Sequence, residues 1–207
     1  MLIRKAFTLN NAHVVRNCYS DRCKYSLHAH TAVIETFIQG NKVDNAGMLM
    51  DFGVAKIVLK PFLELHQDAV LLWMHDNKTY KDFVKSKTDS WIELTFTPSA
   101  ELLSAYFQFY FSSLLSRVKL NNNEDTNIEI LKTRYHETRS GWAESDSTDV
   151  MDLMLDQKWP LTINSMGPDV INKLKSIENK TNFELFGDKT IEIDAPIQQV
   201  TRPQVGV

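Results

Sequence analysis

Residues 28–39 read His28-Ala-His-Thr-Ala-Val-Ile-Glu-Thr-Phe-Ile-Gln39, a stretch that is rich in β-branched residues and alternates in polarity. This pattern predicts a β-strand, because successive strand side chains point to opposite faces of a sheet. Residues 2–15 have the same character and contain another histidine, His13. If the two segments pair as antiparallel strands, His28 and His30 share one face and His13 can meet them from the neighbouring strand.

Three converging neutral imidazoles would leave the fourth position of a tetrahedral zinc ion free, which is typical of a catalytic site and not of a structural one. Half of the six histidines lie between residues 13 and 30, so a metal site is expected in this segment. The same spacing also occurs on ordinary surface strands that bind no metal. The pattern is therefore compatible with a zinc site at His13, His28 and His30 or with ordinary strand histidines.

Composition limits the classes of function. With 207 residues, of which 43% are hydrophobic, the chain can form one large domain or a smaller domain with an extension. A net charge of −3 without a long basic run gives no reason to expect a nucleic-acid partner. The longest strongly apolar run, Ala69–Met74, is too short to span a membrane, and no signal core is seen. Cys18 and Cys23 are interpreted as free thiols, and a cytoplasmic protein is expected.

Two helices are expected in the middle of the chain. The apolar period becomes helical at Phe52, and one stripe is formed by Phe52, Ala55, Leu59, Phe62 and His66. On this stripe His66 is expected to be a core histidine. A second helix is expected to start with Thr97 as its cap and Pro98 in its first turn, and to run to about Leu115.

The remaining segments are shorter. Residues from Asp76 to about Ser90 are interpreted as a polar insertion, and Asn127–Thr138 with Trp142–Ser145 as a second hairpin. We therefore divide the chain into a domain at residues 1–146 and a C-terminal extension at residues 147–207, to which the sequence assigns no role.

Within the extension, two short helices and one strand or extended arm are expected. The helices are Thr148–Gln157 and Asp169–Asn179, and the arm is Phe183–Ile193. The final segment, Ala195–Val207, shows no periodicity.

Several motifs occur in the order found in one family of enzymes. They are Phe7-Thr-Leu-Asn-Asn-Ala-His13, Cys23…Leu27-His-Ala-His30, Gly47-Met-Leu-Met-Asp-Phe52, Pro98-Ser-Ala-Glu101 and Tyr135-His-Glu137-Thr. With these motifs the chain resembles the 6-pyruvoyl-tetrahydropterin and 6-carboxy-tetrahydropterin synthases over roughly residues 5–145. The resemblance implies an α+β tunnelling fold, in which a four-stranded antiparallel sheet carries two helices on one face. It also implies a homo-oligomer, hexameric or built from trimers, whose sheets close into a barrel.

The resemblance implies roles for individual residues. It makes His13, His28 and His30 the ligands of Zn²⁺, and Cys23 the thiol that moves protons at the substrate side chain. Glu137 would accept hydrogen bonds from the edge of the pterin ring.

A second pair of substrate-binding residues comes from the motif at the start of the second helix. The hydroxyl of Ser99 could contact the pterin, with helix capping as the alternative, and Glu101 lies in the same motif.

One departure concerns a catalytic Asp-His pair that the family has at the end of the first helix. A gapless count places Gln67 and Asp68 at these positions, and Asp68 is a weaker base than histidine near neutral pH. His66 lies one residue earlier, so Asp68 and His66 are both candidates for the missing proton-transfer group. A milder departure is Ala29, where the family has glycine.

The activity implied is the zinc-dependent conversion of 7,8-dihydroneopterin triphosphate to 6-carboxy-5,6,7,8-tetrahydropterin, on the route to 7-deazaguanines such as queuosine. Formation of 6-pyruvoyl-tetrahydropterin is the alternative within the same class of lyases. A third possibility is a pterin- or purine-binding protein that has lost turnover together with its Asp-His pair.

Overall fold

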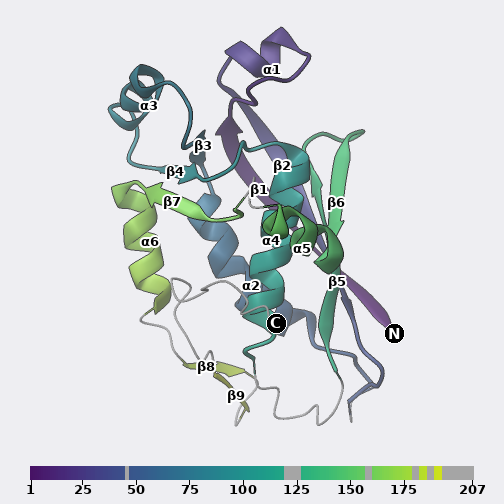
Figure 1. Cartoon of the computed structure of the whole chain (residues 1–207). Helices are drawn as coiled ribbons and strands as arrows, with labels where there is room; N and C mark the ends of the chain where they lie inside the picture. The colour runs from purple at the N-terminus through teal and green to yellow at the C-terminus, as the bar shows by residue number, and fades with distance from the viewer. Residues whose placement is uncertain (45–46, 119–126, 157–159, 179–181, 186–188, 193–207) are drawn as a thin grey trace.

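The computed structural model describes residues 1–44, 47–118, 127–156, 160–178, 182–185 and 189–192 (Figure 1). Its strands are β1 (Leu2–His13), β2 (His28–Gln39), β3 (Ala69–Trp73), β4 (Trp91–Leu94), β5 (Glu129–His136), β6 (Trp142–Asp146), β7 (Ile163–Met166), β8 (Asn182–Leu185) and β9 (Lys189–Glu192). Its helices are α1 (Asp21–Tyr25), α2 (Phe52–His66), α3 (Lys78–Lys85), α4 (Ala100–Leu115), α5 (Ser147–Leu155) and α6 (Pro168–Glu178).

The strands β1 and β2 form the long central hairpin that the sequence predicts. They pair in antiparallel register from Leu2 opposite Gln39 to His13 opposite His28. Alternate side chains, such as Leu9 and Ile34, are buried on the face that meets the helices. The prediction of this hairpin is confirmed, and it brings both ends of the histidine-bearing segment together.

The sheet is larger than expected. Strands β6, β5, β2 and β1 form an antiparallel unit, but β1 also pairs in parallel with β3 through Asn11–His13, and β4 and β7 continue the sheet to seven strands. The expected four-stranded sheet was therefore wrong in its strand number. The added strands β3 and β4 are short runs of mostly buried apolar residues, and such runs lack the alternation that marks a half-buried strand.

The two long helices cover one face of the sheet, as predicted. Helices α2 and α4 pack against β1, β5 and β6, and their aromatic side chains fill the core between these layers (Figure 1). Phe62 of α2 lies against Tyr106 and Phe107 of α4, and Tyr135 of β5 stacks on Phe107. This packing fixes the position of β5, and with it the residue that follows the strand.

The start of α4 differs from the expectation. Ser99, and not Thr97, is the cap, because its side chain accepts a hydrogen bond from the Leu102 backbone N–H at 3.4 Å. Pro98 lies before the helix and is buried.

Residues after 146 add to the same layers. Helix α5 contacts α4 and β6, β7 pairs with β4, and α6 packs against α2 (Figure 1). The two expected helices are confirmed as α5 and α6, and the expected arm contains the β8–β9 pair. The final segment, Ala195–Val207, lies outside the described residues. Within the described part of the chain, no helix is long and apolar enough to cross a membrane.

Candidate active site

The three histidines of the central hairpin meet where β1 ends and β2 begins. His13 is opposite His28 and Asn11 is opposite His30, so the three imidazoles project from the helix-facing side of the sheet. One nitrogen from each ring lies within 4.8 Å of the others. His13 is fully buried, whereas His28 and His30 are partly buried. The expected convergence is therefore present in the structure.

The hydrogen bonding of these rings leaves nitrogens free for a ligand. His28 Nδ1 lies 2.9 Å from the Ser26 carbonyl oxygen, which can only accept, so Nδ1 carries the proton and Nε2 keeps its lone pair. The Nε2 atoms of His28 and His30 and the Nδ1 atom of His13 are buried without a hydrogen-bond partner, while His13 Nε2 faces only the carboxylate of Glu137 at 3.1 Å. Buried polar atoms are rarely left in this state unless an ion or ligand engages them.

The protonation state of His30 also suits a metal. Burial lowers the pKa of His30 below its usual value, and the neighbouring His13 and His28 act in the same direction, although Glu137 opposes the shift. His30 is therefore neutral at physiological pH, which is the form that binds metals. Three converging imidazoles with unpartnered nitrogens fit a zinc ion that keeps one open position.

Glu137, the residue that follows β5, reaches the same cluster. It follows the fully buried Tyr135 by two residues and therefore lies on the same face of the sheet. Its Oε1 atom is 3.1 Å from His13 Nε2 and 3.7 Å from His30 Nε2. The contact with His13 lowers the pKa of the Glu137 carboxyl, so this group is ionised. The sequence placed Glu137 in a pterin pocket but did not predict its contact with the histidines.

Asn11 is a neighbour of the site that the sequence did not single out. It is buried on the same face of β1 as His13, and its side-chain amide donates to the Tyr135 hydroxyl at 3.0 Å. This bond connects β1 to β5 two residues before His13. The signal that could have found it is the two-residue spacing between Asn11 and His13.

Cys23 lies on α1, in the connection between β1 and β2. Its backbone carbonyl accepts a hydrogen bond from the Val15 N–H at 3.0 Å, two residues after His13. Its side chain is partly buried, and both cysteines are free thiols, as expected. This hydrogen bond therefore holds the Cys23 segment against the chain just after His13.

His66 is placed in the core and not on an accessible surface. It is 0% exposed, with Nδ1 2.9 Å from the Phe62 carbonyl and Nε2 2.9 Å from the Tyr106 hydroxyl. Burial lowers its pKa to about 4, so the ring is neutral at physiological pH. A catalytic role for His66 is contradicted by this placement, because no substrate can exchange a proton with a fully buried, fully bonded ring.

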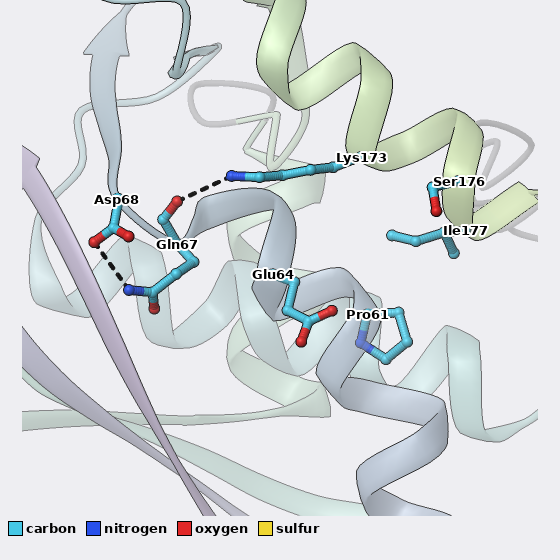
Figure 2. A pocket seen from close by; sticks show the side chains of 7 residues that line it. All are labelled: Pro61, Glu64, Gln67, Asp68, Lys173, Ser176 and Ile177. Carbon is cyan, nitrogen blue, oxygen red and sulfur yellow. Dashed lines mark hydrogen bonds between the residues drawn. The ribbon is translucent and has the colours of Figure 1, made fainter.

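Gln67 and Asp68 lie at the end of α2, beside the extension (Figure 2). Gln67 Nε2 donates to Asp68 at 2.9 Å, its Oε1 accepts from the Asn10 N–H at 3.2 Å, and its carbonyl accepts from Lys173 of α6 at 3.3 Å. Asp68 has a φ of 61° and is exposed. Both residues line a cavity of about 430 Å³ together with Pro61, Glu64, Lys173, Ser176 and Ile177. Gln67 is thus engaged in local structure, and Asp68 is exposed to solvent.

The two candidates on α4 are placed differently from each other. Ser99 uses its hydroxyl as the helix cap, which is the alternative that the sequence left open. Glu101 is exposed in the first turn, where a negative charge is favourable at the helix N-terminus.

The fold and the site together describe an α+β protein whose central hairpin carries three histidines suited to a metal ion. A family model described as 6-pyruvoyl tetrahydropterin synthase matches residues 2–148. A relative from Helicobacter pylori, named 6-carboxy-5,6,7,8-tetrahydropterin synthase, is 32% identical over 145 residues, which are 70% of this chain and 72% of the relative. The chain belongs to the 6-pyruvoyl tetrahydropterin synthase family, and the resemblance seen in the sequence is confirmed.

Two solved structures have a similar fold. An uncharacterized protein from Wolinella succinogenes covers 71% of this chain and 98% of its own length, with a TM-score of 0.57 and 13% identity. The 6-pyruvoyl tetrahydropterin synthase of Caenorhabditis elegans covers 71% of this chain and 95% of its own length, with a TM-score of 0.50 and 16% identity.

Proposed function

We propose that this chain is a zinc-dependent lyase that converts 7,8-dihydroneopterin triphosphate to 6-carboxy-5,6,7,8-tetrahydropterin. The observation that carries the proposal is the group of three converging imidazoles with unpartnered buried nitrogens in a member of a pterin synthase family. The name of the Helicobacter pylori relative supports the 6-carboxy product. Such a product would supply the biosynthesis of 7-deazaguanines such as queuosine, in the cytoplasm.

His13, His28 and His30 would hold the zinc ion. A zinc ion there would act as a Lewis acid toward the oxygens of the substrate side chain. Glu137 would accept hydrogen bonds from the amino group and ring N–H of the pterin, and its ionised state supports this role. Cys23 and Asp68 are the candidates for moving protons at the side chain. Ser99 and Glu101 stay candidates for contacts to the substrate.

The reaction breaks two bonds of the substrate side chain. Cleavage of the carbon–carbon bond next to the first side-chain carbon leaves that carbon as the carboxyl group and releases the other two carbons as acetaldehyde. Cleavage of the carbon–oxygen bond releases triphosphate, and one water supplies the remaining oxygen. Formation of 6-pyruvoyl-tetrahydropterin, to which the family description points, would release triphosphate without acetaldehyde.

A binding protein without turnover is the candidate from another class. It is favoured by the engagement of Gln67 in bonds to Asn10 and Asp68, where the family has its Asp-His pair. Such a protein would bind a pterin or purine and release no product.

We also propose a homo-oligomer, hexameric or built from trimers. Among the described residues, β1 pairs with β3 only through Asn11–His13, so its outer edge before Asn11 lacks a strand partner, and so does the outer edge of β6. Open edges are normally paired or covered in stable proteins. Pairing of these edges between subunits would close the sheets into a barrel.

Incubation of the zinc-loaded protein with dihydroneopterin triphosphate tests the proposed reaction. The expected result is 6-carboxy-5,6,7,8-tetrahydropterin and acetaldehyde in equal amounts. A pyruvoyl product without acetaldehyde would favour the second lyase reaction. Pterin binding measured by calorimetry, in the absence of either product, would favour the binding protein.

A further inference from the structure

The segment that carries Cys23 has little packing of its own. Helix α1 is five residues long and has no buried side chain. The flanking Tyr19 and Leu27 are exposed, as is Tyr25 within the helix. A helix this short is not stable by itself, because the first turn costs more conformational entropy than its hydrogen bonds return. The position of Cys23 therefore depends on contacts from outside the helix.

Two hydrogen bonds from outside α1 hold the backbone at this thiol and at the residue after it. The Val15 N–H donates to the Cys23 carbonyl at 3.0 Å, which extends the end of β1. Arg16 Nη1 donates to the next carbonyl, that of Lys24, at 2.9 Å. The second bond comes from a side chain, so its geometry depends on how that side chain is held.

Arg16 is held by the segment that the sequence shows as a polar insertion. Its Nε atom is 2.6 Å from Asp76 Oδ1, and its guanidinium lies over the Tyr80 ring, 4.9 Å from the ring centroid. A planar guanidinium can satisfy two acceptors in fixed directions and stack on a ring at the same time, which a lysine ammonium cannot do. The Arg16 side chain thus connects the α1 segment to the segment that runs from β3 to α3. Helices α1 and α3 lie at the same end of the molecule (Figure 1).

The acceptor for Arg16 is itself well fixed. The Asp76 side chain is only 2% exposed, and its Oδ2 atom accepts a hydrogen bond from the Trp73 N–H at 3.3 Å. The Asp76 N–H donates in turn to the Trp73 carbonyl at 2.9 Å. The following helix is anchored by Lys81, whose Nζ reaches the Met74 carbonyl at 2.5 Å. A buried carboxylate needs a partner, and Arg16 supplies it.

We infer that Arg16, seated on Asp76 and Tyr80, is a positioning residue that fixes the Cys23 segment beside the histidine cluster. The inference rests on the proposed function in so far as Cys23 moves a proton there. It gives the segment from β3 to α3 a role, because the Asp76 carboxylate and the Tyr80 ring of this segment fix the Arg16 side chain. Arg16 acts through the backbone of Lys24 and is not itself a group that touches the substrate.

The test compares Arg16→Lys with the wild type. Lysine keeps the positive charge but cannot donate to Asp76 and to the Lys24 carbonyl at the same time. Amide hydrogen exchange of residues 20–26 should therefore become faster, by roughly tenfold or more, while exchange in β1 and β2 stays unchanged. Turnover should fall by about 10- to 100-fold at nearly constant KM, because a misplaced catalytic group affects the chemical step. Zinc content should stay at the wild-type level.

The matched control is Arg4→Lys, since Arg4, like Arg16, pairs with a carboxylate, that of Glu35. It is near the opposite end of β1, so neither exchange of residues 20–26 nor turnover should change. Asp76→Asn should reproduce the Arg16→Lys effect in part. In the double variant the two effects should be less than additive, because both remove the same contact.

A direct contact of Arg16 with the triphosphate would give a different result. KM would then rise, kcat would change little and exchange of residues 20–26 would stay at the wild-type rate; this outcome would overturn the inference. The exchange measurement needs no substrate. If the wild type shows no turnover, the proposed reaction fails, yet faster exchange in Arg16→Lys would still support the positioning contact, and unchanged exchange would refute it.

Discussion

His13 of the central hairpin and His66 of α2 are both fully buried, but their ring nitrogens differ in hydrogen bonding. His66 has a partner for each nitrogen, in Phe62 and Tyr106. His13 Nδ1 is buried without a partner, as are the Nε2 atoms of His28 and His30, and His13 Nε2 faces only Glu137. A satisfied ring is part of the packing, whereas unsatisfied rings that face one another are suited to an ion. Burial alone would not have separated these two kinds of histidine.

The largest expected effect concerns the cluster. In His28→Ala the zinc content should fall from one ion per subunit to well below half, because a three-histidine site loses one of three ligands. Turnover should fall by roughly 10³-fold or more if zinc polarises the substrate. Metal analysis of the purified protein by mass spectrometry measures this, with the exposed His75→Ala as the matched control. Full zinc content in His28→Ala would contradict the assignment of the ligands.

A second expected effect concerns the stability of the protein at low pH. Burial lowers the pKa of His66 to about 4 in the folded chain, while in the unfolded chain it has its ordinary value of 6.5. Between these values only the unfolded chain binds the proton, so the stabilisation present above pH 6.5 is lost as the pH falls to 4. The shift corresponds to about 3 kcal/mol in the free energy of unfolding.

Urea unfolding of the wild type and of His66→Gln between pH 7 and pH 4 measures this contribution. The wild type should lose about 3 kcal/mol more than the variant over this range. Replacement of the exposed His75 by Gln should leave the wild-type slope unchanged. Equal slopes for wild type and His66→Gln would mean that the His66 ring takes up its proton over the same pH range in the folded and in the unfolded chain, and would contradict the lowered pKa.

A smaller effect is expected for Glu137, the carboxylate beside the unsatisfied rings. In Glu137→Gln the affinity for a dihydropterin should fall by roughly 10- to 100-fold, because charge-assisted hydrogen bonds to the ring edge are lost. Zinc should remain, since the three imidazoles are unchanged. Titration calorimetry measures the affinity, and Glu129→Gln at the start of β5 is the control. Unchanged affinity together with lost zinc would make Glu137 a partner of the metal.

The sequence predicted the parts of the fold that have long, regular periods. The β1–β2 hairpin and α2 were found because each carries a regular apolar pattern over many residues, and α4 was found from the start signal Thr97-Pro98 before a long apolar run. Ala69–Trp73 and Trp91–Leu94 were missed as strands, because four or five mostly buried residues show no alternation.

The site was predictable to the same extent. Strand alternation was sufficient to bring His13, His28 and His30 together. The proton on His28 Nδ1 and the contact between His13 and Glu137 depend on how distant segments pack, which one chain's sequence does not reveal. The apolar stripe of α2 did indicate that His66 is a core residue, and its burial confirms this.

The pairing of β7 with β4 limits where this chain can be truncated without exposing a strand edge. The family match ends at residue 148, but β4 and its buried Ile92 are covered on one side by Ile163–Met166. Gly167 then passes so close to Asp89 that a Cβ atom would lie 2.2 Å from the Asp89 carbonyl oxygen. A fragment that ends at residue 148 would leave the outer edge of β4 without a strand partner, and such an open edge can pair with other chains and cause aggregation. We therefore expect the smallest fragment of this protein that folds without aggregating to extend through α6.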